Sequence, residues 1–218
     1  MSILAIDTCE GSCSAALVEE RRVFASRSEY IGRGHAERLL PMLDALLVEG
    51  GVGYDSIRRI AVTTGPGTFT GLRIGLSVAR GLGLALDVPV VGLSSLVALA
   101  ASVREPDATV HAIVMGRGGQ GFHQAFQTTE YAFMPRILSE ARSMDGPDIA
   151  AEVQAVPGVV VGSGRSLATG GLDNSIQAVD PVVLGRLATP LDAICHPAEP
   201  TYLRAADAVK AKALLPTE

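Results

Sequence analysis

The chain has 218 residues, a mass of 22.6 kDa, a mean hydropathy of +0.32 and a formal net charge of -5. A chain of this length can bury about 70% of the surface that its unfolded form exposes, so a stable core requires neither disulfides nor a structural metal. Its eighteen Lys and Arg residues occur singly or in short pairs, which argues against tight, direct binding of nucleic acid.

The first half of the chain has the pattern of strands followed by alternating helices and strands. Short apolar or alternating runs predict strands at residues 3–6, 12–18, 23–28, 57–64 and 90–93. Leucines at helical spacing predict a helix from residue 34 to the glycines at 50–51. Further helices are predicted at residues 71–86 and 94–102, the second capped by Ser94 or Ser95. This order is typical of an α/β sheet.

A polar stretch at residues 104–107 predicts a domain boundary, with an amino-terminal lobe at 1–103 and a smaller, more divergent carboxy-terminal lobe at 104–218. In the second part, strands are predicted at 111–115, 122–127 and 159–162, and a helix at 182–188. The glycine cluster at 116–121 predicts a hairpin. Residues 143–148 and 169–180 have the composition of loops.

The glycine-rich loop at residues 65–71 is the sharpest local feature. Glycines permit close approach of the backbone, and the helix that follows offers free N–H donors, so the loop could hold a phosphate. Aspartate at the end of a strand could position a nucleotide's metal ion or phosphate. The candidate nucleotide residues are Asp7, Thr8, Gly65, Gly67, Thr68 and Thr70. The alternative is a strand-to-helix turn capped by Thr68 or Thr70, because the lysine of a P-loop is absent.

The two long predicted helices are apolar on more than one face. In the second, Gly71, Gly75, Ala79 and Gly83 recur every four residues, which forms a small-residue ridge. This pattern predicts a helix-mediated interface with a partner protein. The candidate residues are His35, Leu39, Met42, Leu43, Leu46, Leu72, Gly75, Leu76, Ala79 and Gly83. The alternative is that both faces are covered within the chain.

Catalytic and metal sites are not predicted. Position 39 is Leu, so His35 lacks a second histidine one turn along its helix and is expected on the surface or at the interface. Cys9 is as typical of a small buried hydrophobe as of a nucleophile. The three cysteines lack the paired spacing of a zinc site and favour the cytoplasm. No secretory signal is recognisable, and the arginines within residues 71–86 indicate a buried helix rather than a membrane span.

Several motifs resemble one protein family. These are residues 3–8 (ILAIDT), 35–41 (HAERLLP), 65–75 (GPGTFTGLRIG) and 199–204 (EPTYLR), with a dense match over residues 1–102. Together they resemble the TsaB (YeaZ) proteins. The resemblance implies a two-lobed actin-like fold (ASKHA, ribonuclease H-like) with mixed sheets and flanking helices. It also implies a protein related to, but degenerated from, the catalytic subunit TsaD.

In functional terms, the resemblance implies a non-catalytic subunit that docks on a TsaD-type protein through its first two helices. The complex would transfer a threonylcarbamoyl group to N6 of adenosine 37 in tRNAs that read ANN codons. A TsaE-type ATPase would be a further partner and the complex would use ATP, while this chain would have no cofactor of its own and reach tRNA only through the complex. The isolated chain is expected to be a homodimer in the cytoplasm. The alternatives are an ATP-dependent phosphotransferase of the same fold and a glycoprotease-type metallopeptidase.

Overall fold

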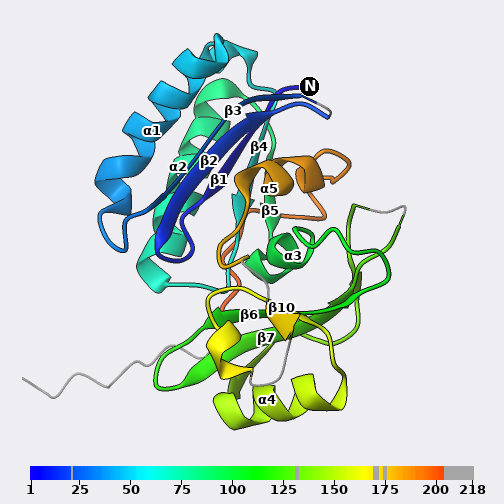
Figure 1. Ribbon diagram of the computed structural model, residues 1–218. Helices are drawn as coiled ribbons and strands as arrows, with labels where there is room; N and C mark the ends of the chain where they lie inside the picture. Colours follow the sequence, from blue (N-terminus) through cyan, green and yellow to red (C-terminus); the bar gives the residue numbers. More distant parts are fainter. Residues whose placement is uncertain (21, 131–132, 169–171, 174–175, 204–218) are drawn as a thin grey trace, which may run out of the picture.

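The computed structural model describes residues 1–203 except 21, 131–132, 169–171 and 174–175. The chain forms two lobes, one above the other in Figure 1, and each is built around a mixed β-sheet. This confirms the predicted α/β class and its two-lobed arrangement.

The first sheet has five strands in the order β3-β2-β1-β4-β5. The strands are β1 (Ile3–Asp7), β2 (Ser12–Val18), β3 (Val23–Tyr30), β4 (Arg59–Thr63) and β5 (Val90–Leu93). The first three form an antiparallel meander, while β4 and β5 run parallel to β1. All five were predicted from the sequence, with ends that differ by up to two residues.

Helices cover both faces of this sheet. On one face lie α1 (His35–Gly50) and α2 (Phe69–Leu86), and on the other lies α5 (Pro181–Ala188). Successive side chains of a strand point to opposite faces. Accordingly, Leu4 and Ile6 pack with α1 and α2, whereas Ile3 and Ala5 pack with α5. The uninterrupted apolar run of β1 is therefore explained by burial on both sides.

The second sheet has the order β11-β10-β6-β7-β8, with β9 also paired to β7. Its strands are β6 (Thr109–Met115), β7 (Gln120–Gln127), β8 (Arg136–Ile137), β9 (Arg142–Asp145), β10 (Val159–Val161) and β11 (Leu172–Asp173). Strand β6 pairs antiparallel with β7 and parallel with β10. In the same way, β1 pairs antiparallel with β2 and parallel with β4. The two sheets thus repeat one topology, although the residue pattern shows no repeat.

Two further helices flank the second sheet. Between the two sheets lies α3 (Ser95–Ala100), and α4 (Gly146–Ala155) covers the outer face of the second sheet. Short 3-10 turns occur at Tyr54–Ser56 and Arg165–Leu167. The prediction of a loop at 143–148 was wrong, because β9 and the start of α4 lie there. The polar strand and a helix that buries only Gly146, Ile149 and Val153 leave little apolar pattern to detect.

The predicted division into 1–103 and 104–218 is wrong for the carboxy-terminal part. The apolar helix α5 covers the bare face of the first sheet, and the chain after it stays on that lobe. The guanidinium of Arg59 on β4 donates to the Ala188 carbonyl at 2.6 Å and also to that of Leu191. The Thr201 amide donates to the carbonyl of Thr64 at 2.8 Å. The second lobe therefore comprises the elements from β6 to β11.

Among the described helices, α2 is the one whose length and composition would suffice to cross a membrane. A core helix of a globular domain meets the same criterion. Here its buried face, which includes Leu72, Leu76 and Ala79, packs against the first sheet.

Part of the predicted loop at 169–180 lies outside the described residues, and Leu172–Asp173 within it forms β11.

Candidate functional site

The glycine-rich loop packs tightly against the end of β1. The Thr68 amide donates to the Cys9 carbonyl at 2.6 Å, and the Thr8 hydroxyl donates to the Gly71 carbonyl at 2.7 Å. A side chain at Gly67 would collide with the Cys9 carbonyl, and one at Gly71 with that of Thr8. The Thr68 hydroxyl oxygen accepts from the Gly71 amide at 3.2 Å and caps α2, as one of the predictions proposed.

The predicted phosphate residues therefore come together, but as a packed junction. Asp7 and Thr8 are 2% and 1% exposed, and Gly65 is also buried. The Asp7 carboxylate accepts from the Thr63 hydroxyl at 2.6 Å and the Cys9 amide at 3.2 Å, while burial raises its pKa. Because Thr8 and Cys9 fill the space over the glycines, the strand-to-helix turn, and not the phosphate loop, fits this structure. Thr70 is exposed outside the junction.

Cys9 was interpreted as either a small buried hydrophobe or a nucleophile, and its surroundings fit the first of these. Its side chain is 1% exposed, and its thiol donates to the Thr63 hydroxyl at 3.0 Å. Burial, with the charge of Asp7, raises the pKa of the thiol far above its ordinary value. A thiol in this state is a poor nucleophile.

Glu10 joins the two lobes, a role that sequence reasoning missed. Its carboxylate accepts a hydrogen bond from the Ser163 hydroxyl, which follows β10 in the second lobe. The same hydroxyl accepts from the Met115 amide at 2.9 Å. Burial raises the pKa of Glu10 to about 7; the Ser163 hydrogen bond lowers it and the charge of Asp7 raises it. The contact depends on residues 153 positions apart, so no local pattern could reveal it.

A second buried polar cluster lies between β6, β7 and α4. His111 Nε2 lies 2.8 Å from the Val156 carbonyl and therefore donates to it, so His111 Nδ1 accepts from His123 Nε2 at 2.9 Å. His123 Nδ1 lies 3.3 Å from a Glu152 carboxylate oxygen but carries no proton in this arrangement, so the two atoms do not form a hydrogen bond. Burial and the neighbouring His111 lower the pKa of His123 to about 4, so the ring is neutral near pH 7. The hydrogen bond from His111 to the Val156 carbonyl therefore ties the end of α4 to β6.

The ten residues predicted for the partner interface are all buried within this chain. Seven of them belong to the apolar core between α1, α2 and the first sheet: Leu39, Met42, Leu43, Leu46, Leu72, Leu76 and Ala79. The ridge faces the chain's own strands, because a side chain at Gly75 would meet Thr8 and one at Gly83 would meet Val90. His35 is 5% exposed, with Nε2 3.2 Å from the Ser12 carbonyl oxygen. The assignment of these residues to an exposed interface is therefore wrong.

The outward sides of the same two helices are nevertheless apolar. Leu40 and Val48 on α1 are 48% and 81% exposed, and Leu84 on α2 is 87% exposed. Gly81 is exposed, and a Cβ there would meet nothing within 4 Å. We define the α1–α2 face as the exposed or half-buried residues Leu40, Pro41, Val48, Ile74, Val78, Gly81 and Leu84.

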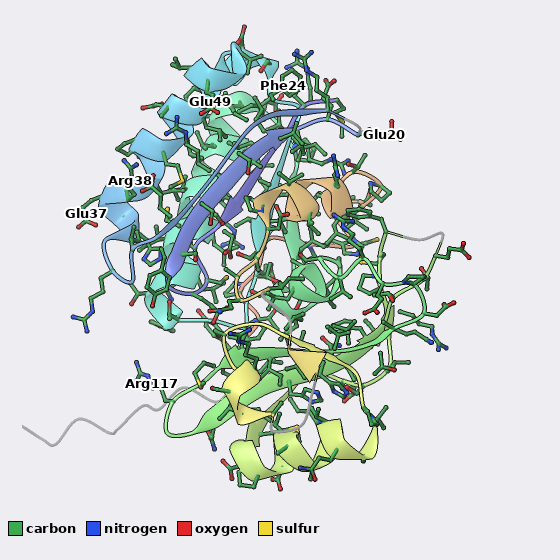
Figure 2. All side chains as sticks on the ribbon, in the orientation of Figure 1. Glu20, Phe24, Glu37, Arg38, Glu49 and Arg117 are labelled. Carbon is green, nitrogen blue, oxygen red and sulfur yellow. The ribbon has the colours of Figure 1, made fainter. Side chains whose placement is uncertain are left out.

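Charged residues border this face on the side of β3. Arg38 on α1 donates to Glu29 through Nε at 2.6 Å, and Arg27 donates to Glu49 at 2.7 Å. Figure 2 shows Glu37, Arg38 and Glu49 along α1, and Arg117 far from them in the second lobe. An apolar centre with a polar rim is the usual anatomy of a protein interface. Among the described residues, no group of three or more His, Cys, Asp or Glu is placed to hold a metal ion.

Two mixed sheets of one topology, each flanked by helices and joined through a shared core, define an actin-like (ASKHA) protein. A family profile described as "TsaD: tRNA N6-adenosine threonylcarbamoyltransferase" matches residues 25–155. The tRNA threonylcarbamoyladenosine biosynthesis protein TsaB of Escherichia coli (strain K12) is 33% identical over 220 residues, 94% of this chain and 95% of that protein. The chain belongs to the TsaB (YeaZ) family.

Two further comparisons agree with this assignment. TsaB of Bacillus subtilis (strain 168) is 36% identical over 127 residues, which are 58% of this chain and 56% of that protein. The solved structure of YeaZ from Pseudomonas aeruginosa has a TM-score of 0.75 and 31% identity, and the match covers 93% of this chain and 99% of that one.

Proposed function

We propose that this chain is a non-catalytic subunit in the biosynthesis of threonylcarbamoyladenosine on tRNA, and that it binds and activates a TsaD-type catalytic subunit. Family membership supports the pathway, because the relative in Escherichia coli bears the name of a tRNA threonylcarbamoyladenosine biosynthesis protein. The TsaD profile supports a partner of related fold.

The observation that carries the proposal is the α1–α2 face. Large apolar side chains such as Val48 and Leu84 are more than 80% exposed there, and exposed apolar patches with polar rims mark interaction sites. The face lies on the outer side of the first lobe (Figure 1), so a partner can approach it freely. In the isolated chain the same face pairs two copies as a homodimer.

The proposal of a non-catalytic role is based on the contacts of the acidic residues beside the glycine-rich loop. A phosphotransferase of this fold would need Asp7 beside its phosphates, but here that carboxylate accepts from Thr63 and Cys9. Burial and Asp7 raise the pKa of the neighbouring Glu10, and among the described residues Ser163 is the one favourable partner of its charge. These facts favour a partner over the stand-alone phosphotransferase.

The proposed reaction, the use of ATP and the contact with tRNA belong to the complex of this chain with its TsaD-type partner. The TsaD-type subunit transfers a threonylcarbamoyl group to N6 of adenosine 37 in tRNAs that read ANN codons, with a TsaE-type ATPase as a further partner. ATP is used by the complex, and this chain supplies no cofactor. A net charge of -5 suits a chain that reaches tRNA only through its partners. The complex works in the cytoplasm.

Substitution of Gly81 by Arg tests the docking face. Gly81 is exposed and a side chain there would meet nothing within 4 Å of its Cβ, so the variant should fold. An arginine projecting from the face should weaken the complex with the TsaD-type protein of the same organism about 100-fold or more, because it adds bulk and an unpaired charge. Size-exclusion chromatography with light scattering and calorimetry would measure the complex.

Ala151→Arg is the matched control, because Ala151 is exposed on α4 in the other lobe. It should leave the affinity unchanged. Binding of Gly81→Arg equal to that of the unsubstituted chain would remove the α1–α2 face from the proposal. Failure of the unsubstituted chain to form a 1:1 complex at micromolar concentration would overturn the subunit role itself.

A further inference from the structure

Two of the sequence motifs that suggested the family meet on the surface at the amino-terminal end of α2. Phe69 and Arg73 belong to the glycine-loop motif, and Tyr202 belongs to the motif at residues 199–204, of which residue 204 lies outside the described residues. The Arg73 guanidinium carbon lies 3.6 Å from the centre of the Phe69 ring, and Nε donates to the Tyr202 hydroxyl at 3.3 Å. The centres of the two rings are 6.0 Å apart. We call these residues the Phe69–Arg73–Tyr202 cluster.

The cluster is open to solvent although it is largely aromatic. Phe69 is 52% exposed and Tyr202 is 51% exposed, and Arg73 is exposed as well. Tyrosine and arginine are the residue types that dominate the binding energy of protein interfaces. The local contacts do not bury these rings, so their arrangement is explained better by an incoming partner than by the stability of this chain alone.

The guanidinium of Arg73 is held in place but not saturated. The Phe69 ring fixes its plane and Tyr202 binds Nε, while its two terminal nitrogens make no hydrogen bond to any residue that the structure describes. A planar guanidinium whose outer edge binds none of the described residues matches a carboxylate, which can accept two parallel hydrogen bonds. Because the side chain is already ordered, binding such a group costs less conformational entropy.

The cluster is continuous with the α1–α2 face. Residues three or four positions apart lie next to each other on a helix, and Arg73, Ser77, Gly81 and Leu84 are all exposed along α2 at this spacing. A partner seated over Gly81 and Leu84 would therefore reach Arg73 as it extended toward the start of α2.

We propose that the Phe69–Arg73–Tyr202 cluster receives a carboxylate side chain of the protein that docks on the α1–α2 face, with the two aromatic rings flanking it. This inference rests on the proposed function. A protein carboxylate fits better than a nucleic acid phosphate, because backbone recognition of nucleic acid uses several cations. The cluster itself holds one cation, and the next exposed one on α2, Arg80, lies two turns away, in a chain whose net charge is -5.

Calorimetric affinity between the full chain and the TsaD-type protein tests the inference. Arg73→Glu should weaken binding about 100-fold, because it places two carboxylates together. Arg73→Lys should weaken it about 10-fold, since an ammonium lacks the planar fork. Tyr202→Phe, which removes only the hydroxyl that binds Nε, should weaken it a few-fold, roughly the worth of one hydrogen bond. Thermal unfolding should show that all three variants remain folded, because the residues are exposed.

The control is Arg104→Glu. Arg104 is also an exposed arginine beside an exposed aromatic ring, 5.4 Å from the centre of Phe133, but it lies between α3 and β6 and away from the α1–α2 face. Its substitution should leave the affinity unchanged. Equal effects of Arg73→Glu and Arg104→Glu would show a general charge effect and overturn the inference.

The outcomes separate this inference from the proposed function. If Gly81→Arg disrupts the complex while Arg73→Glu binds within twofold of the unsubstituted chain, the docking face stands and the carboxylate site is overturned. If neither variant weakens the complex, the docking face fails and the carboxylate site with it. If Arg73→Glu preserves the protein complex but reduces its retention of tRNA, the cluster contacts RNA and the inference is wrong.

Discussion

Glu10 holds its proton to a higher pH than an ordinary glutamate because of where the fold places it. The carboxylate lies at the contact between the lobes, and burial raises its pKa from 4.5 to about 7. In the unfolded chain the proton is released near the lower value. Between these pH values the folded state therefore binds more protons than the unfolded state, and the free energy of unfolding decreases as pH rises.

Replacement of Glu10 by Gln should remove this dependence. The amide still accepts from Ser163 and carries no charge, so the variant should match the parent chain near pH 4.5 and exceed its stability above pH 7. A pKa shift of this size corresponds to about 3 kcal/mol. Urea denaturation of both chains at pH 5 and pH 8 measures the difference, in which the titration of other groups cancels. Parallel pH profiles for the two chains would show that the proton is not held at Glu10.

The residue scale is also where prediction from sequence was weakest. Periodicity correctly predicted the helix that begins at His35, but it could not show which side of that helix faces the strands. The ring turns inward to the Ser12 carbonyl, whereas a surface position was expected. Similarly, the leucines at helical spacing were recognised. A helix that is apolar on two sides, however, does not reveal which side the chain's own sheet covers.

At the scale of elements, α2 shows two uses of glycine in one helix. Gly71 lies where the helix starts, and a Cβ there would collide with the Thr8 carbonyl and lie 2.7 Å from the Thr68 hydroxyl oxygen. Gly81 faces open space. The same residue type therefore allows close packing on β1 at one end and leaves the outer face flat at the other.

Alanine at these two positions should have opposite effects. Gly71→Ala should lower the free energy of unfolding by about 1–3 kcal/mol, because the backbone of Thr8, just after β1, must move to admit the methyl group. Gly81→Ala should raise it by up to about 1 kcal/mol, because alanine favours the helix and nothing obstructs it. Chemical denaturation of both variants measures the contrast. Changes of the same sign would show that the junction is not tightly packed in solution.

Most elements of the first lobe were predictable because each carries a strong local pattern. Buried strands such as β1 read as apolar runs, and α1 and α2 have leucines at helical spacing together with glycines or caps at their ends. The helix α4 was missed because its first turn, Gly146-Pro147-Asp148, has the composition of a loop. Pro at the first turn is compatible with a helix, but composition alone does not distinguish the two.

At the scale of the whole molecule, the two lobes share one core. A single buried cluster contains Ile3 and Ala5 of β1, Leu96 of α3, Val110 of β6 and Leu184 of α5. The change of composition near residue 104 falls between α3 and β6, after the chain has left the first sheet. It gives no sign that α5 returns to it, because that contact depends on which face the earlier helices leave bare.

A shared core predicts that the lobes unfold together. Leu184 is fully buried at the first sheet, so Leu184→Ala should lower the free energy of unfolding by about 2–5 kcal/mol through lost burial and a cavity. If opening is global, the amides of β1 and of β6 should lose hydrogen-exchange protection by the same factor, although β6 belongs to the other lobe. Leu138→Ala, at a leucine that is 44% exposed, serves as the matched control and should change neither. Loss of protection in β1 with β6 unchanged would mean that the lobes open separately and that α3 does not couple them.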